Sequence, residues 1–217
     1  MTLPCIELEP REPCTSSVIW LHGLGADGSD FAPIAPMFGL HSTRFVFPHA
    51  PHQPVTINGG YVMRSWYDIL TMDRGPERES EPDIRASARE VEALIQRERD
   101  RGVPSSRIVL AGFSQGGAMA LHVGIRYPET LAGIVVLSAY QVLADTVERE
   151  ASAANSQTPL FFAHGTRDEV VPTFAGQEAA ARYGTRATWL TYPMGHEVHP
   201  QEIADIKAWM HARLGAA

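Results

Sequence analysis

The pentapeptide Gly-Phe-Ser-Gln-Gly at residues 112–116 has the form G-x-S-x-G and lies between a β-rich run and a helical run. In a nucleophile elbow, the serine of such a motif occupies a strained strand-to-helix turn that pushes its hydroxyl out of the sheet. Glycines flank the serine because side chains would collide there, and the helix N-terminus favours developing negative charge. The motif and its context predict Ser114 as a nucleophile, whereas the letters alone also fit a glycine-rich turn with an incidental serine.

Two candidate partners for Ser114 follow later strands. A nucleophilic serine needs a base and a group that orients the base, and in the α/β-hydrolase arrangement they occur in the order Ser, acid, His, each on a loop after a strand. Asp168 follows an expected strand at residues 160–163, and His196 follows the next one at residues 188–192. The sequence therefore predicts a catalytic triad of Ser114, Asp168 and His196.

Each partner has a competitor close by in the sequence. Glu169 is adjacent to Asp168, and His199 follows His196 by three residues. We favour Asp168 because it comes earlier in its turn. We favour His196 because the glycine before it gives its loop conformational freedom. His199 precedes a proline at an expected helix start and is expected to be either a helix cap or a surface residue.

The backbone is expected to supply the oxyanion hole. One donor is the N–H of the residue after the nucleophile, Gln115, and a second usually comes from the loop after an early strand. The expected strand at residues 18–21 runs into His-Gly-Leu-Gly, so we expect the N–H of Leu24 to be that donor. Loss of one such donor costs about 3–4 kcal/mol of transition-state stabilisation.

The loop at residues 23–28 also fits G-x-G-x-x-G after a strand, which is typical of a dinucleotide site. That function needs an acidic residue about 20 positions later. The sequence has no Asp or Glu between Asp30 and Asp68, which argues against a dinucleotide cofactor.

The nine histidines raise the alternative of a metal site. His49 and His52 are three residues apart but lie in a proline-rich stretch, and residues 196–199 are one residue too short for H-E-x-x-H on a helix face. We therefore expect no catalytic metal. His22 and His164 are expected to brace loops beside the site.

Short apolar runs alternate with longer amphipathic stretches along the chain. The expected strands are residues 18–21, 44–47, 108–111, 134–137, 160–163 and 188–192, with Cys5–Leu8 as an additional edge strand. The expected helices contain an apolar stripe at residues 84–95 or cover residues 115–126, 172–182 and 200–214. This alternation predicts an α/β fold with a mostly parallel central sheet and helices on both faces.

The 217 residues are expected to form a single domain, 1–217, without a separate cap domain. The longest stretch without a clear pattern, residues 48–80, is expected to be a loop that is either functional or partly ordered by its own side chains. Within it, Trp66 and Tyr67 are either plain core or one wall of an acyl pocket, with Leu24, Leu70 and Val171 near its mouth.

Composition excludes several classes of function. The net charge is −7 and no run of arginines forms a concentrated basic face, so nucleic acid is not an expected partner. Lys207 is the single lysine and follows no glycine-rich loop, which disfavours Schiff-base enzymes and phosphate-loop NTPases.

The cellular setting follows from what the sequence lacks. Cys5 and Cys14 are too few for a disulfide framework, and two free thiols are expected in preference to one local disulfide. The N-terminal residues do not show a basic region followed by an apolar one, and the longest apolar run is about half of a membrane span. We expect a cytoplasmic protein without stable membrane insertion.

Motifs throughout the chain resemble one known family. The matching segments are residues 20–28, 50–51, 65–68, 112–117, 168–171 and 192–197. Together they resemble the carboxylesterase and acyl-protein thioesterase family of α/β-hydrolases, and are most similar to its small bacterial esterase branch. By motif position, the resemblance also assigns the triad to Ser114, Asp168 and His196. His199 lies outside the family's pattern, and residues 71–80 look individual to this chain.

The resemblance implies hydrolysis of short- to medium-chain acyl esters, in some members thioesters or lysophospholipids, without a cofactor. It implies a small-molecule acyl ester as partner and a homodimer as an assembly found among family members. Two alternatives stay open at this point. The fold can be kept by an inactive binding protein, and an amidase or peptidase can use the same triad.

Overall fold

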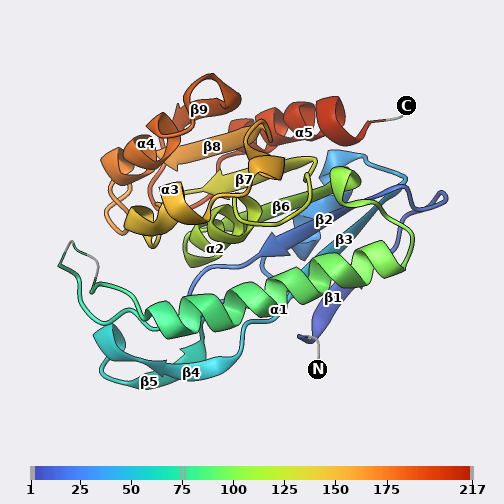
Figure 1. The fold of residues 1–217 in the computed structure, drawn as a ribbon. Helices are drawn as coiled ribbons and strands as arrows, with labels where there is room; N and C mark the ends of the chain where they lie inside the picture. Colours follow the sequence, from blue (N-terminus) through green and yellow to red (C-terminus); the bar gives the residue numbers. More distant parts are fainter. Residues whose placement is uncertain (1–2, 74, 76, 216–217) are drawn as a thin grey trace.

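The computed structural model describes residues 3–73, 75 and 77–215, so residues 1, 2, 74, 76, 216 and 217 of the expected domain lie outside it. Its centre is a seven-stranded sheet in the order β1-β3-β2-β6-β7-β8-β9 (Figure 1). The strands are β1 (Cys5–Leu8), β2 (Ser16–Leu21), β3 (Thr43–Pro48), β6 (Ile108–Phe113), β7 (Gly133–Leu137), β8 (Leu160–Gly165) and β9 (Ala187–Tyr192). Only β1 runs antiparallel to its neighbour in this sheet; the other five pairings are parallel. The mostly parallel sheet and the edge strand Cys5–Leu8 confirm the prediction.

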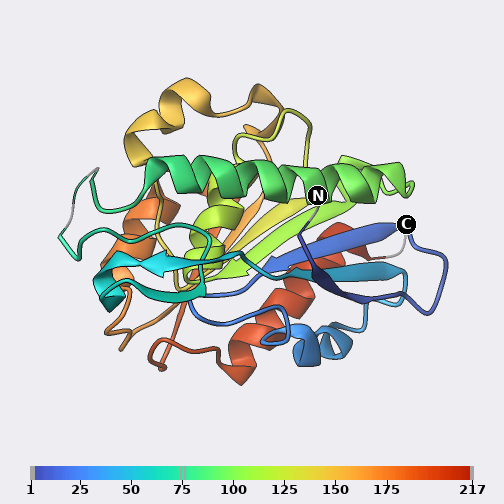
Figure 2. The same ribbon diagram turned by 90° about the horizontal axis from the view of Figure 1, so that it is seen from below.

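Helices cover both faces of the sheet. The α-helices are α1 (Glu81–Asp100), α2 (Gln115–Gly124), α3 (Val147–Glu150), α4 (Thr173–Ala181) and α5 (Pro200–Leu214). The 3-10 helices are η1 (Ala32–Phe38), η2 (Thr56–Asn58), η3 (Ser105–Arg107), η4 (Ala144–Thr146), η5 (Ala153–Asn155) and η6 (Gly184–Arg186). Figure 2 shows α1 to α4 on one side of the sheet and α5 with η1 on the other.

The strands are nearly continuous in apolar residues because both faces of the sheet are buried. In β2, Ile19 and Leu21 belong to the core under α1 and α2, whereas Val18 and Trp20 belong to the core under α5 and η1. Alternate side chains along a strand point to opposite faces, so one strand contributes to both cores.

The ends of α1 follow from local chemistry. The Ser80 side chain accepts a hydrogen bond from the Asp83 N–H, and Glu81 adds negative charge to the first turn. The helix stops before Gly102, whose φ of +95° continues the chain in a left-handed conformation. The predicted apolar stripe at residues 84–95 faces the core, which confirms the expected amphipathic helix.

Residues 48–80 contain structure that the sequence did not indicate. The strands β4 (His52–Val55) and β5 (Tyr61–Arg64) form an antiparallel hairpin, and Gly59 and Gly60 adopt positive φ in its turn. Apart from this hairpin, every strand that the structure describes belongs to the seven-stranded sheet. Residues 52–64 of the segment therefore have regular structure of their own.

The structure also bears on the lysine, the cysteines and the membrane question raised by the sequence. The single lysine, Lys207, is exposed on α5. Cys5 and Cys14 are free thiols, as expected. Among the described residues, no helix is long and apolar enough to span a lipid bilayer.

Candidate active site

Ser114 lies in a strained turn between β6 and α2. Its φ and ψ of 54° and −121° are outside the conformations that side-chain-bearing residues ordinarily adopt. A Cβ on Gly112 would overlap the Gly116 carbonyl, and one on Gly116 would overlap the Leu21 carbonyl. The glycines thus let the backbone turn sharply enough to present the Ser114 hydroxyl at the carboxyl edge of the sheet.

A continuous chain of hydrogen bonds links Ser114 to the loops after β8 and β9. His196 Nε2 is 2.9 Å from Ser114 Oγ, and His196 Nδ1 is 2.7 Å from Asp168 Oδ2. The Asp168 side chain is fully buried, whereas the His196 side chain keeps 18% of its surface exposed. The structure therefore brings together the three residues of the predicted triad.

The Asp168 carboxylate is held by its own loop. Its Oδ1 accepts hydrogen bonds from the N–H groups of Val170 at 2.9 Å and Val171 at 2.8 Å, which leaves Oδ2 for His196. Because a carboxylate accepts, His196 Nδ1 carries the proton and the Nε2 lone pair faces the Ser114 hydroxyl. This is the tautomer that can take a proton from serine.

The two competing residues lie elsewhere. Glu169 is an exposed residue of the loop after β8. His199 precedes α5, where its Nδ1 accepts a hydrogen bond from the Gln201 N–H at 3.1 Å. The expected helix cap at His199 is confirmed.

The proposed oxyanion donors face the same cavity as the serine. Leu24 and Gln115 both line the cavity that contains Ser114 and His196. For neither residue does the described part of the chain provide a hydrogen-bond acceptor for the backbone N–H. The α2 N-terminus, which begins at Gln115, adds a favourable dipole at this point. Both N–H groups can therefore bind an oxyanion.

His22 braces the loop that carries Leu24. Its Nε2 accepts a hydrogen bond from the Ala50 N–H at 3.0 Å, so its Nδ1 carries the proton and donates to the Gly23 carbonyl at 2.7 Å. Burial lowers the pKa of His22 to about 4, so that it stays neutral around pH 7. The expected bracing role of His22 is thus supported by its contacts.

The glycine-rich loop at residues 23–28 uses its backbone differently from a dinucleotide site. The Gly25 N–H donates to the Arg64 carbonyl at 2.9 Å, and the Gly28 N–H donates to His49 Nδ1 at 3.0 Å. These donors are engaged within the protein and not directed at a phosphate. In the part of the chain that the structure describes, no three His, Cys, Asp or Glu side chains are grouped so that they could hold a metal ion.

The Gln115 side chain has a role that the sequence analysis missed. Its Oε1 accepts from the Trp66 N–H at 2.7 Å, and its Nε2 donates to the Tyr67 carbonyl at 2.7 Å and to Ser65 Oγ at 3.1 Å. One amide thereby ties the segment before α1 to the nucleophile turn. The only sequence signal was a polar residue inside an otherwise small and apolar helix start, and nothing indicated a partner 50 positions away.

The cavity at Ser114 has a volume of about 280 Å³. Its apolar walls are Ile57, Ile69, Met72, Tyr67, Val170 and Val171. Of the five residues expected in the pocket or at its mouth, three line the cavity, namely Leu24, Tyr67 and Val171, whereas Trp66 and Leu70 do not. Trp66 is fully buried behind it, with Nε1 donating to the His22 carbonyl at 2.9 Å, and Leu70 is 44% exposed.

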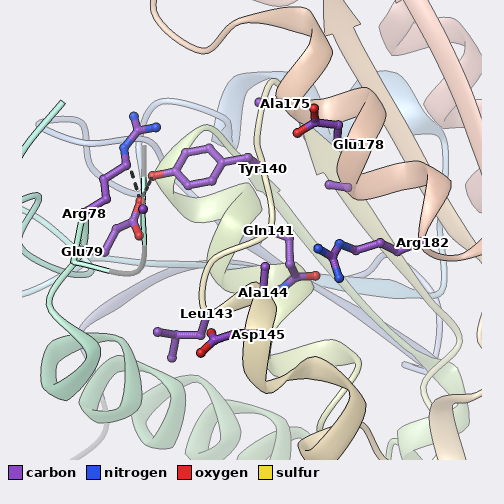
Figure 3. A pocket seen from close by; sticks show the side chains of 12 residues that line it. Arg78, Glu79, Tyr140, Gln141, Leu143, Ala144, Asp145, Ala175, Glu178 and Arg182 are labelled. Carbon is purple, nitrogen blue, oxygen red and sulfur yellow. Dashed lines mark hydrogen bonds and ion pairs between the residues drawn. The ribbon is translucent and has the colours of Figure 1, made fainter. Parts of the chain in front are cut away.

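A second cavity of about 410 Å³ lies next to the first and shares Arg78 and Tyr140 with it (Figure 3). The Tyr140 hydroxyl donates to Glu79 Oε1 at 2.6 Å, and the Arg78 guanidinium lies 4.8 Å from the centre of the Tyr140 ring. Tyr140 therefore forms a wall between the cavities. Among the described residues that line the larger cavity there is no Ser, Cys or His, so the nucleophile and base belong to the smaller one.

Known proteins resemble the chain over its whole length. Residues 4–214 match the family described as Phospholipase/Carboxylesterase. Acyl-protein thioesterase 1 of Cryptococcus neoformans is 36% identical over 236 residues, covering 98% of both chains. Acyl-protein thioesterase 1 of Saccharomyces cerevisiae is 31% identical and covers 94% of this chain and 96% of its own.

Solved structures agree with the sequence comparisons. SOBER1 of Arabidopsis thaliana superimposes with a TM-score of 0.85 at 32% identity, covering 92% of this chain and 99% of its own. The esterase PE8 superimposes with a TM-score of 0.87 at 25% identity, covering 99% of this chain and 100% of its own. The fold of this chain is thus shared with a solved structure named as an esterase.

Proposed function

The chain belongs to the phospholipase/carboxylesterase family of α/β-hydrolases and is a carboxylic ester hydrolase; on this premise we propose that Ser114 is its nucleophile, His196 its general base and Asp168 the acid that orients the base. The substrates we propose are short- to medium-chain acyl esters, with thioesters and lysophospholipids as further substrates of the same site.

One observation carries the proposal. Ser114 Oγ, both nitrogens of His196 and Asp168 Oδ2 form an unbroken hydrogen-bonded chain, with separations of 2.9 and 2.7 Å. These lengths lie within the range in which a base can take a proton from a nucleophile. The proton-accepting nitrogen of His196 also faces the hydroxyl in the tautomer derived above.

In the acylation step, Ser114 Oγ attacks the acyl carbon while its proton passes to His196 Nε2. The negative charge that develops on the carbonyl oxygen is accepted by the N–H groups of Leu24 and Gln115. The bond to the leaving group then breaks, and His196 delivers its proton to the departing alcohol or thiol. The product of this step is an ester between Ser114 and the acyl group.

In the deacylation step, a water molecule takes the place of the leaving group. His196 Nε2 removes a proton from the water, whose oxygen attacks the acyl carbon, and the same two N–H groups hold the oxyanion. The bond to Ser114 Oγ breaks, the proton returns to the serine, and the free acid leaves. Asp168 stabilises the protonated imidazole in both steps without taking its proton.

The cavity supports an acyl substrate by its chemistry. Its apolar side chains lie on η2, on the segment after β5 and on the loop after β8, and they line the same cavity as Ser114. Burial of alkyl groups against such a surface stabilises binding by about 0.8 kcal/mol for each methylene. A volume of about 280 Å³ suits a chain of modest length. We place the acyl group here.

The setting of the enzyme is part of the proposal. We propose that the chain works as one domain in the cytoplasm and assembles as a homodimer. Light scattering coupled to size-exclusion chromatography measures the assembly, and cell fractionation measures the location. A monomer at all concentrations or a membrane-bound pool would contradict these statements without touching the catalytic assignment.

Replacement of the nucleophile tests the proposed function most directly. We expect Ser114→Ala to lower kcat for a chromogenic short-chain ester by about 10⁶-fold while the protein stays folded. A fluorophosphonate probe should label the unaltered protein and not this variant. Ser138→Ala is the matched control, because Ser138 is a serine that, like Ser114, has a positive φ, yet it is buried and its hydroxyl makes no hydrogen bond among the described residues.

The control variant Ser138→Ala should still be labelled by the fluorophosphonate probe and should keep most of its esterase activity. Ser114→Ala with more than a tenth of the unaltered rate would remove Ser114 from the mechanism. A folded protein that neither turns over esters nor reacts with the probe would instead indicate an inactive hydrolase fold.

A further inference from the structure

One fully buried histidine near the triad has no part in the mechanism above. His164 lies near the end of β8 and has no exposed surface. Its ring lies against α4, where a Cβ on Gly176 would overlap Nδ1, and its centre is 6.0 Å from that of the Trp189 ring on β9. Such close packing holds the imidazole in one orientation.

The hydrogen bonds of His164 define its tautomer. Its Nε2 is 2.8 Å from the Val171 carbonyl, which can only accept, so Nε2 carries the proton. In the described part of the chain, Nδ1 has no hydrogen-bond partner. Burial lowers the pKa of His164 below its ordinary value, which keeps the ring neutral around pH 7.

The same N–H is directed at the catalytic loop. Nε2 of His164 is 3.5 Å from Asp168 Oδ2, the oxygen that binds His196. Val171, whose carbonyl it holds, also donates its own N–H to Asp168 Oδ1 at 2.8 Å. His164 therefore contacts the loop at Val171 and lies beside the carboxylate oxygen that binds His196.

We propose that His164 is a positioning residue for the catalytic acid: its Nε2–H fixes the loop at the Val171 carbonyl and directs partial positive charge at Asp168 Oδ2. The inference rests on the proposed triad, in which that oxygen orients His196. It adds a fourth side chain to the charge distribution of the site, acting only through Asp168.

The electrostatic consequence has a definite sign. The titratable groups that act on His164 are Asp168 and His196, and its neighbours from α4 and β9, Gly176 and Trp189, are uncharged. Removal of the His164 N–H leaves more negative charge on Oδ2, which stabilises protonated His196. Since catalysis needs neutral His196, the acid limb of the pH profile of kcat/KM should move to higher pH.

The test compares two substitutions at His164. His164→Leu removes the donor, whereas His164→Gln can keep an N–H near the position of Nε2. We expect the leucine variant to lower kcat/KM at pH 7 by roughly threefold to tenfold and to move the acid limb upward by about 0.5 to 1 pH unit. The glutamine variant should restore most of both. Thermal denaturation establishes that each variant is folded.

His122 provides the matched control. It is also a buried histidine with an unpartnered Nδ1, and burial lowers its pKa to about 3. It lies in α2 beside Arg126 and does not contact Asp168. His122→Leu is expected to lower stability but to leave the acid limb where it is.

Three outcomes would overturn the inference: an unmoved limb in His164→Leu, an equal movement in His122→Leu, or no restoration by glutamine. If His164→Leu does not fold, Gly176→Ala serves instead, because its methyl group displaces the ring while the histidine stays. A folded Gly176→Ala with an unmoved limb would equally overturn it. Loss of the Ser114→Ala effect would contradict the proposed function itself, so the two failures are distinguishable.

Discussion

The two ends of the parallel strands each hold a carboxylate whose side chain is completely buried. At the carboxyl ends, Asp168 is bound by two backbone N–H groups and by His196. At the amino ends, Glu98 of α1 accepts from Ser17 Oγ at 2.6 Å, Arg44 at 2.8 Å and Arg101 at 3.1 Å. The burial is the same, but the partners differ in kind.

That difference separates catalysis from stability. A guanidinium stays protonated at every physiological pH, so the charges around Glu98 are constant. An imidazole ordinarily titrates near neutrality, so the charge beside Asp168 can change during a reaction. The amino end of the sheet is therefore built as a static ion cluster, and the carboxyl end as one in which a proton can move.

The largest expected effect is at the carboxyl end. Asp168→Asn keeps the shape of the side chain but favours the wrong tautomer of His196, and we expect kcat to fall by about 10⁴-fold. The matched control is Asp145→Asn, which makes the same change in the larger cavity behind Tyr140. It should alter kcat/KM less than twofold in the same steady-state assay. Equal losses in the two variants would erase the distinction between the cavities.

An intermediate effect is expected at the amino end, on stability alone. Glu98→Gln leaves Arg44 without the buried half of its ion pair, and we expect the free energy of unfolding to fall by about 3 kcal/mol. Glu9→Gln is the control, because Glu9 pairs with the same Arg44 from a side chain that is 62% exposed. Its cost should stay below about 1 kcal/mol.

Urea denaturation measures both losses, and ester hydrolysis at low urea should be unchanged in both variants. A Glu98→Gln protein with normal stability but impaired catalysis would show that the two ends are not separate in function.

The smallest expected effect concerns a third buried carboxylate, which pairs with no cation in the described part of the chain. Glu202 is fully buried at the start of α5, where it accepts from the His199 N–H at 3.0 Å, and burial raises its pKa to about 7. Because the folded state holds this proton more tightly than the unfolded state, its stabilising effect is complete below about pH 4.5 and is lost as the pH rises through 7.

Glu202→Gln should remove that loss, because glutamine also completes the capping box. We expect the variant to gain about 2 kcal/mol over the unaltered protein at pH 8 and to gain nothing at pH 4.5. Urea denaturation across this pH range measures the difference. A difference that is constant with pH would exclude Glu202 as the titrating group.

The elements that the sequence predicted are those whose pattern is local. The buried strands and α5 were identified because continuous apolar runs and a proline at the first helical turn are local consequences of burial and backbone geometry. The β4–β5 hairpin and η1 were missed. The two strands of the hairpin are only four residues long. The helix η1 contains Pro33 and Pro36, and proline normally argues against a helix interior.

The site divides in the same way. Ser114, Asp168 and His196 were predicted because each follows a recognisable strand. The Gln115 side chain and the position of Trp66 depend on contacts between residues about 50 positions apart. The ion pair between Glu98 and Arg44 joins residues that are 54 positions apart in the sequence. Contacts of this kind depend on how whole helices and strands pack against one another, so the local sequence pattern does not predict them.

Lys207 has a practical consequence for how the protein can be handled. It carries the only side-chain amine of the sequence and is exposed on α5, whereas the cavity with Ser114 lies at the carboxyl edge of the sheet. Amine-directed coupling to a solid support would attach through this one side chain, apart from the chain's amino terminus. The molecules that attach through Lys207 would then share one orientation, with the catalytic edge presented to the solution in the same way by each.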